Sequence, residues 1–224
     1  MISQIREPLS KIAQPIIIFF ARLGIHPTVF TVIGLLLSIV AGVFLALDNF
    51  LVAFVLLWIG GAMDFIDGGV ARYLKVDSKK GSFLDSVIDR VSDIAVFVGI
   101  IWSEPVDGVT GTIMVASALM VSYVRAKGES MGIQRMAIGI MERAERWLGL
   151  IVLLFISLLV PAPEGATLGA FVTPIYYIAG EGISYFSIGY MVLTGLCVIT
   201  VIQRFIYASI QLTKAEQVKE PQQS

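Results

Sequence analysis

Charged residues, cysteine and histidine are all scarce in this sequence. Only 15% of its 224 residues are charged, whereas 57% are hydrophobic, and the mean hydropathy is +0.86. These values lie outside the range of ordinary soluble domains and indicate a protein embedded in a lipid bilayer. The single cysteine, Cys197, excludes an intramolecular disulfide, and we expect it to be a small core side chain. With one histidine besides, the sequence has almost none of the nitrogen and sulfur ligands that zinc favours.

Long uncharged stretches predict six membrane-spanning helices. A span needs about 20 apolar residues to cross a hydrocarbon core roughly 30 Å thick, and an isolated strand cannot satisfy its backbone in lipid. The expected spans cover about 28–47, 49–73, 82–102, 110–125, 142–160 and 182–210. We therefore expect an all-α integral membrane protein, with a single domain over residues 1–212 and a polar C-terminal tail over 213–224.

The N-terminal segment, residues 1–23, differs from the expected spans. Its basic residues are spaced along it, and it has no small-residue cleavage site, so it does not read as a signal peptide. This pattern favours an amphipathic helix that lies on the membrane surface ahead of the first span.

Basic residues predict the orientation in the cell membrane. All 16 Lys and Arg lie in the N-terminal segment, in the connections at 72–90 and 125–146, or in the last helix and the tail. The three opposite connections carry none. Under the positive-inside rule both termini face the cytoplasm, which agrees with an even number of spans.

Five aspartates lie inside the second and third expected spans. Inserting an aspartate at the centre of a span costs about 2.5 to 3.5 kcal/mol, so a cluster indicates a function. Asp64 and Asp67 are three residues apart, and Asp85, Asp89 and Asp93 follow at intervals of four, so each set projects from one face of its helix. A short connection makes the two helices antiparallel. We expect the carboxylates to converge on one pocket near the cytoplasmic end.

Converging carboxylates repel one another unless a positive charge lies among them. Hard oxygen ligands suit Mg²⁺, Mn²⁺ or Ca²⁺, and Mg²⁺ usually completes its coordination with water and substrate phosphate. We therefore expect two divalent cations and a substrate that contains phosphate. Small residues beside the acids, Gly68, Gly69, Ala71 and Gly81, leave space for a ligand. The alternative is that they only allow the helices to pack closely.

The spacing of these residues resembles a known signature. The segment DFIDGGVARYLKVDSKKGSFLDSVID, Asp64 to Asp89, fits D-x2-D-G-x2-A-R-x8-G-x3-D-x3-D without a mismatch. This resembles the CDP-alcohol phosphotransferases, and the expected topology extends the resemblance over essentially the whole chain. The resemblance implies a six-helix membrane fold, usually a homodimer, with a polar cavity that opens to the cytoplasm. It also implies transfer of a phosphate-linked lipid group from a CDP-alcohol to a second alcohol.

Site residues follow from the same resemblance. The positions that match the metal ligands, expected to hold two Mg²⁺ or Mn²⁺ ions, are Asp64, Asp67, Asp85 and Asp89. Asp89 also matches the general base that removes the proton of the acceptor hydroxyl. The positions that match contacts to the CDP-lipid are Gly68, Ala71, Arg72 and Thr31. Thr31 resembles the threonine of a P-N-x-x-T element, although Thr28 stands where that element usually has Asn.

Basic residues on the same side indicate an anionic acceptor, because guanidinium groups bind phosphate in bidentate geometry. The candidates are Arg125, Arg143 and Arg204, whereas for Lys127 and Arg135 we prefer an anchoring role at lipid headgroups.

The segments SYVRAKGE and ERAER resemble the branch of the family that makes phosphatidylinositol phosphate, or its archaeal ether-lipid counterpart. Its members use a CDP-lipid (CDP-diacylglycerol or CDP-archaeol) and inositol phosphate, and the resemblance makes Arg125, Arg143 and Arg204 the ligands of the acceptor phosphate. Gly128 before Glu129, and Ala144 where many relatives have Pro, depart from the pattern.

Two other functions compete with this hypothesis. Glycerol-3-phosphate as acceptor, giving phosphatidylglycerol phosphate, would also need cationic residues. A divalent-cation transporter would also carry aspartates in its spans, but no polar residues continue toward the outer side in the first, fifth or sixth span. Membrane lipid and a second copy of the chain are expected partners, and nucleic acid is not.

Overall fold

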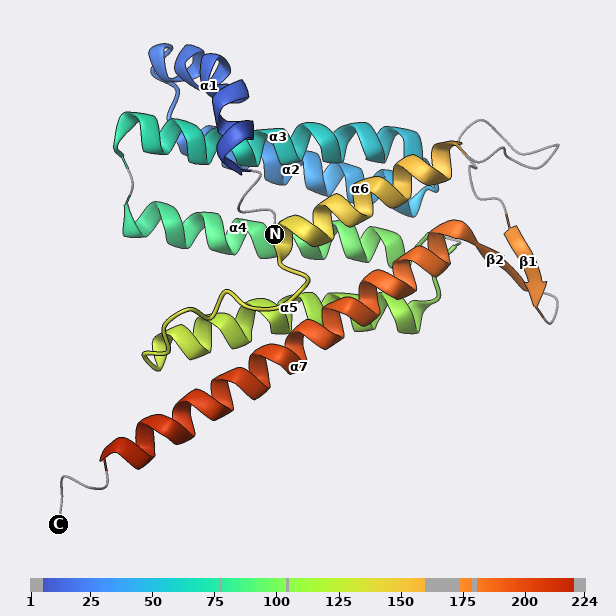
Figure 1. Ribbon diagram of the computed structural model, residues 1–224. Coiled ribbons are helices and arrows are strands. Elements are labelled where there is room, and N and C mark those ends of the chain that lie inside the picture. Colours follow the sequence, from blue (N-terminus) through green and yellow to red (C-terminus); the bar gives the residue numbers. More distant parts are fainter. Residues whose placement is uncertain (1–5, 77, 104, 160–173, 179–180, 220–224) are drawn as a thin grey trace.

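The computed structural model describes residues 6–76, 78–103, 105–159, 174–178 and 181–219 (Figure 1). Its elements in these residues are α1 (Arg6–Arg22), α2 (Pro27–Ala46), α3 (Phe50–Leu74), α4 (Lys79–Ile101), α5 (Gly108–Ser130), α6 (Arg143–Leu159), β1 (Pro174–Ile178), β2 (Glu181–Ser184) and α7 (Tyr185–Lys219). The connections α3–α4 and α5–α6 lie at one end of the helices, and the β1–β2 hairpin lies at the other (Figure 1). Consecutive helices from α2 to α7 are therefore antiparallel, as the predicted topology requires.

Four helices in the described part of the chain, α2, α3, α5 and α7, are long and apolar enough to cross a membrane. The predicted integral membrane class is thereby supported. Two other expected spans differ in character. The first half of α4 carries aspartates, and α6 is described over only 17 residues. The count of six spans therefore stays a prediction.

The C-terminal third departs from an all-helical structure in one place. An antiparallel hairpin pairs β1 with β2, and α7 begins only at Tyr185, later than the predicted span. At its other end α7 continues through Lys219, so part of the predicted polar tail is helical. With 35 residues and a rise of 1.5 Å per residue, α7 is about 52 Å long and exceeds the membrane core. Residues 160–173, which include the last residue of the predicted span 142–160 and part of the connection that follows it, and residues 220–224 lie outside the described residues.

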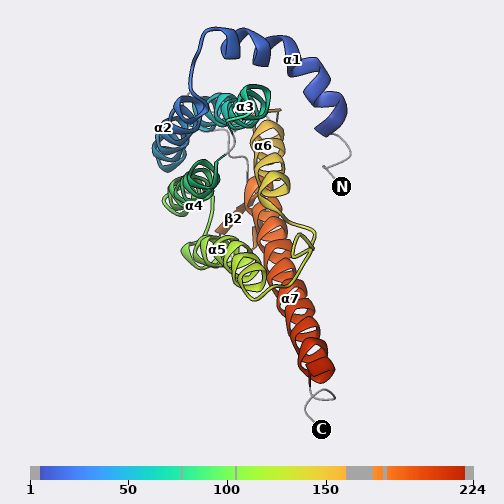
Figure 2. The ribbon, with the colours of Figure 1, turned by 90° about the vertical axis from the view of Figure 1, so that its left-hand side faces the viewer.

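The N-terminal helix α1 packs across α3 (Figure 2). Ile17 and Ala21, four residues apart, are buried against Phe30 of α2 and Val70 of α3. A Cβ atom at Gly69 would lie 2.5 Å from Cδ1 of Ile17, so a larger residue there would force the Ile17 side chain to move. The space that the sequence predicted beside Gly69 is therefore filled by α1. The segment is helical over Arg6–Arg22, and its amphipathic character and its position on a membrane surface stay predictions.

The backbones of α2 and α4 touch at two glycines. A Cβ atom at Gly99 would lie 2.1 Å from the carbonyl oxygen of Gly42, and one at Gly42 would lie 2.4 Å from that of Ala95. Small residues allow such close approach of helices in membranes, where packing replaces the hydrophobic effect as the driving force. Because α2 also packs against α3, this contact sets the position of α4 relative to α3.

Polar residues define where the helices begin. Asn49, Ser78 and Asp107 precede α3, α4 and α5, and a side-chain oxygen of each accepts a backbone N–H three residues later. Hydrogen bonds from Thr110 lower the pKa of Asp107. Lys75, with φ of 54°, ends α3 in the left-handed region. Only four residues separate Leu74 from Lys79, and α3 and α4 are antiparallel, as predicted from the sequence.

We expect Gly99→Ala to destabilise the protein by about 1 to 3 kcal/mol, because the added methyl group forces two backbones apart. Thermal unfolding in detergent measures the change. Gly61→Ala is the matched control, since a Cβ atom there meets nothing within 4 Å and alanine is the better helix former by about 1 kcal/mol. Equal melting temperatures for Gly99→Ala and the wild type would show that the helices do not meet at Gly42.

Candidate active site

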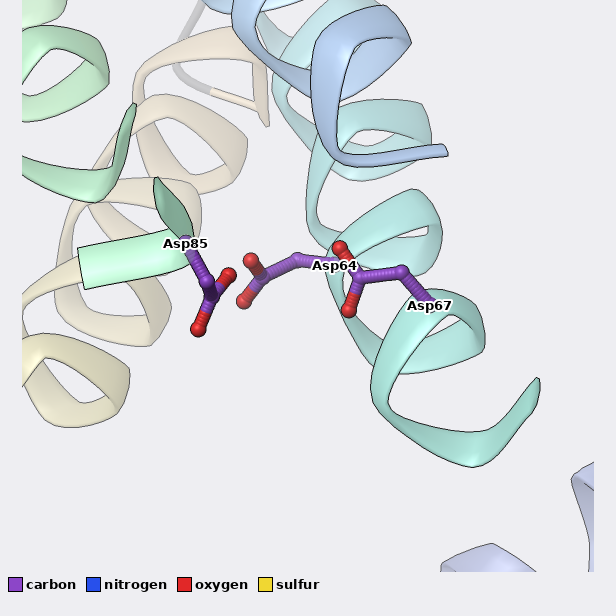
Figure 3. Close-up of side chains that lie close together, drawn as sticks. All are labelled: Asp64, Asp67 and Asp85. Atoms are coloured by element: carbon purple, nitrogen blue, oxygen red, sulfur yellow. The ribbon is translucent and has the colours of Figure 1, made fainter. Parts of the chain in front are cut away.

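Three aspartates come together where α3 and α4 face each other. Asp64 and Asp67 on α3 and Asp85 on α4 each offer a carboxylate oxygen, and these oxygens lie within 4.8 Å of one another. The carboxylates of Asp64 and Asp85 point toward each other from the two helices (Figure 3). Asp67 is buried and Asp85 is exposed, so the cluster has an open side. The geometry agrees with the convergence predicted from the spacing.

Thr31 on α2 holds the buried member of this cluster. Its hydroxyl donates a hydrogen bond of 2.7 Å to Oδ2 of Asp67, and both side chains are less than a tenth exposed. Thr31 thus orients one carboxylate from a neighbouring helix. Its predicted contact with the CDP-lipid stays a prediction.

Arg143, at the start of α6, extends into the acidic cluster. Its Nη1 atom lies 2.8 Å from Oδ2 of Asp64 and 2.9 Å from Oδ1 of Asp89. The guanidinium group also lies over the ring of Trp147, 5.3 Å from its centroid. One cation therefore joins carboxylates of α3 and α4. Asp89 lies outside the group of three and contacts Arg143, so its role as a metal ligand stays a prediction.

A second ionic network, centred on Asp93 one turn further along α4 than Asp89, was not predicted from the sequence. Asp93 is 4% exposed and accepts hydrogen bonds of 2.8 Å from Nη2 of Arg146 and from Nε1 of Trp147. Arg146 is 1% exposed. The sequence contains only one kind of evidence for this network, which is the spacing of its residues. Asp93 continues the interval of four from Asp89, and Arg146 and Trp147 follow Arg143 by three and four residues.

Arg204 and Arg125, the other predicted ligands of the acceptor phosphate, pair with groups other than the clustered aspartates. Arg204 is 2% exposed, and it donates to the backbone oxygens of Ile138 and Val121 and to Glu142. These bonds link α7 to α5 and to the segment that precedes α6. Arg125 is exposed and pairs with Glu129 at 2.9 Å. It lies near enough to Arg204 for their charges to interact, and direct contacts of either with an acceptor stay predictions.

The predicted contacts to CDP occupy one side of α3 after the aspartates. Gly68 is followed by Ala71 and Arg72 at three and four residues, the spacing of neighbours on a helix surface. A Cβ atom at Gly68 would lie 3.3 Å from Nη1 of Arg72, so this guanidinium lies along the glycine. Gly81, by contrast, donates its N–H to the Ser78 cap of α4. Its role in the structure is to start the helix.

The donor set fits a hard divalent cation. Carboxylate oxygens are ligands that Mg²⁺ and Mn²⁺ prefer, and three of them already lie within 4.8 Å. In the described part of the chain no salt bridge reaches Asp67 or Asp85. Their negative charges repel each other and that of Asp64, and a bound cation would relieve the repulsion.

Comparison with known proteins agrees with this site. Residues 24–202 match the model of the CDP-alcohol phosphatidyltransferase family. The archaetidylinositol phosphate synthase of Pyrococcus horikoshii is 37% identical over 154 residues, which cover 69% of this chain and 78% of that protein. The same enzyme of Methanothermobacter thermautotrophicus is 33% identical over 207 residues, covering 92% of this chain and 93% of that protein.

A solved structure has the same fold. The phosphatidylinositol phosphate synthase of Mycobacterium tuberculosis, with CDP-DAG bound, matches with a TM-score of 0.71 and 25% identity, covering 88% of this chain and 94% of that one. The same protein in complex with manganese and citrate matches with a TM-score of 0.70 and 26% identity, covering 87% of each chain.

Apolar helices long enough to span a bilayer, together with an acidic cluster between α3 and α4, define a multi-pass membrane protein with a site suited to a divalent cation. The match over residues 24–202 is more specific. This chain belongs to the CDP-alcohol phosphatidyltransferase family, as the sequence signature indicated. Membership decides against the divalent-cation transporter, the alternative from another class of protein.

We expect Mn²⁺ to raise the melting temperature of the wild-type protein and to have much less effect on Asp85→Asn, because the variant loses one of three converging carboxylates. In EDTA the variant should be at least as stable as the wild type, since it also loses repulsion with Asp64. Glu129→Gln, which removes an exposed carboxylate of α5, is the control and should keep the full response to Mn²⁺. An unchanged response in Asp85→Asn would remove Asp85 from the metal site.

Proposed function

We propose that this protein transfers a phosphatidyl-type group from a CDP-linked lipid to a hydroxyl of inositol phosphate and releases CMP. The observation that carries the proposal is the position of Arg143, whose guanidinium lies 2.8 Å from Asp64 and 2.9 Å from Asp89. A cation in this place can hold an anionic acceptor beside the carboxylates. The names of the archaeal relatives and of the mycobacterial structure support inositol phosphate as that acceptor.

The metal site in this proposal consists of Asp64, Asp67, Asp85 and Asp89, and it holds two Mg²⁺ or Mn²⁺ ions. Bound cations would neutralise the diphosphate and stabilise CMP as the leaving group. Thr31 keeps Asp67 in place through its hydrogen bond of 2.7 Å. The support for a divalent cation is the convergence of the carboxylates and the manganese in a related structure.

The CDP-lipid binds along α3 in the proposal. Gly68 and Ala71 have little or no side chain and allow the diphosphate to approach the backbone. Arg72 contributes a positive charge on the same face, and Thr31 lines the pocket beside Asp67. Support comes from the placement of Arg72 alongside Gly68, directly after Asp67.

The acceptor binds on the other side of the aspartates. Arg143, with Arg125 and Arg204, binds its phosphate, since guanidinium groups are suited to this geometry. Asp89 then accepts the proton of the attacking hydroxyl. Its contact with Arg143 supports this division of roles, because the base and the phosphate ligand lie next to each other.

We further propose six spans, with α4 and α6 completing the four long apolar helices, and both termini and the active site on the cytoplasmic side. The basic connections α3–α4 and α5–α6 lie at the end of the molecule that carries the aspartates, which supports this orientation. The proposal also includes the association of two copies of the chain as a homodimer.

The acceptor is tested by incubating the purified protein with CDP-lipid, Mg²⁺ and one alcohol at a time, and by measuring labelled lipid and CMP. Inositol phosphate should give product, whereas inositol and serine should not, because they lack the phosphate that Arg143 binds. Product from glycerol-3-phosphate and none from inositol phosphate would refute the proposed acceptor and leave the family assignment intact.

Asp89→Asn should lower turnover by about 10²- to 10⁴-fold, because the amide cannot accept the proton. Binding of the CDP-lipid should be largely kept. Single-turnover rates and binding of labelled CDP-lipid measure the two effects separately. Full activity in this variant would exclude Asp89 as the base.

Arg143→Ala should raise the KM for inositol phosphate by at least about 10-fold, given that hydrogen bonds to charged groups contribute about 1.5 to 3 kcal/mol, and should change the KM for CDP-lipid far less. Lys127→Ala removes an exposed positive charge from α5, near Arg125, and serves as the control. Equal increases in both KM values would place Arg143 outside the acceptor site.

A further inference from the structure

Asp93 is a fifth carboxylate inside the helices, and neither the family signature nor the metal cluster accounts for it. Resting on the function proposed above, we propose that Asp93 is a positioning residue, which holds the first turn of α6 so that Arg143 faces Asp64 and Asp89. It acts on the reaction through Arg143 and has no contact of its own with the substrates.

The contacts of Asp93 use both of its oxygens. Oδ2 accepts a hydrogen bond of 2.8 Å from Nη2 of Arg146, and Oδ1 accepts one of 2.8 Å from Nε1 of Trp147. Oδ1 also lies 3.5 Å from Nε of Arg143. One buried carboxylate thus contacts three side chains of α6: it accepts hydrogen bonds from two of them and lies at ion-pair distance from the third.

The spacing of these donors restricts the motion of α6. Arg143, Arg146 and Trp147 stand at i, i+3 and i+4, so they share one face of the helix. A rotation of α6 about its axis, or a slide along α4, would break all three contacts together. Asp93 therefore fixes both the rotation of α6 about its axis and its position along α4, and with them the turn that carries Arg143.

The residues before Arg143 are held as well. The hydroxyl oxygen of Thr200 on α7 accepts the backbone N–H groups of Ile140 and Met141. Nη1 of Arg146 donates to the carbonyl oxygen of Met141 at 3.3 Å. The chain that leads into α6 is fixed on α7, and Asp93 supplies the corresponding contact on α4.

Burial explains why the charge matters. Asp93 is 4% exposed and Arg146 is 1% exposed, so neither group is compensated by solvent. An uncharged residue at position 93 would leave the guanidinium of Arg146 buried without a counter-charge. The guanidinium of Arg146 would then have to move toward other acceptors, which would disturb the first turn of α6.

A double-mutant cycle tests the proposal. Asp93→Asn should lower kcat/KM for inositol phosphate by on the order of 10- to 100-fold, the scale expected for a misplaced catalytic or binding group. The KM for CDP-lipid should change little. In an Arg143→Ala background the same Asp93→Asn change should have little further effect, because the residue that it positions is absent.

An equal fold-loss from Asp93→Asn in both backgrounds would overturn the proposal, since it would show that Asp93 acts independently of Arg143. The Mn²⁺-induced rise in melting temperature shows whether each variant keeps its fold. If Asp93→Asn fails to fold, Trp147→Phe replaces it in the cycle, because it removes a single donor to Asp93. A Trp147→Phe enzyme with unchanged acceptor kinetics would then overturn the proposal.

The cycle also separates this inference from the proposed acceptor. Should the wild type use glycerol-3-phosphate in place of inositol phosphate, the cycle is measured with glycerol-3-phosphate. Coupling between Asp93 and Arg143 with that acceptor would support the positioning role while the proposed acceptor fails.

Discussion

The site depends on holding several negatively charged aspartate side chains close together inside a membrane protein. Asp64, Asp67 and Asp85 lie within 4.8 Å of one another, and Asp89 joins them through Arg143. Charged side chains in a span are costly, and neighbouring carboxylates add repulsion to that cost. The surrounding structure must therefore supply enough packing and enough positive charge to keep them in place. Arg143 contributes within the chain, and the donor set suits a divalent cation.

Close contacts between helices supply the packing that offsets this repulsion. Gly42 and Gly99 allow α2 and α4 to meet backbone to backbone, and Gly69 allows α1 to reach α3 through Ile17. Small residues are the usual means of such contact in a bilayer, where apolar side chains gain little by leaving lipid. Positive charge comes from α6, whose first turn is attached to α4 by Asp93 and to α7 by the segment before it. Site and fold therefore share the same helices.

Much of this organisation could be predicted from local patterns. Apolar runs placed the helices to within a few residues, except at the ends of α5 and α7, which continue to Ser130 and Lys219, because lipid allows little other backbone structure. The intervals of three and four between aspartates placed them on one face of α3 and of α4, and the short turn made these helices antiparallel. Cys197 is buried and free, as expected. The hairpin of β1 and β2 was missed because its residues, PIYYI and EGIS, carry no spacing that distinguishes a strand from a loop.

The sequence by itself determined the membrane class, the acidic faces and the family signature, since these depend on composition and on residues close together in the chain. Tertiary structure decided the partners of the arginines. Arg143, Arg146 and Arg204 all carry the same charge, yet Arg143 faces Asp64 and Asp89, Arg146 is buried on Asp93, and Arg204 is enclosed by Val121, Ile138 and Glu142. The reason is physical: a guanidinium pairs with the acceptors that packed helices bring within reach, and those lie tens of residues away in the chain.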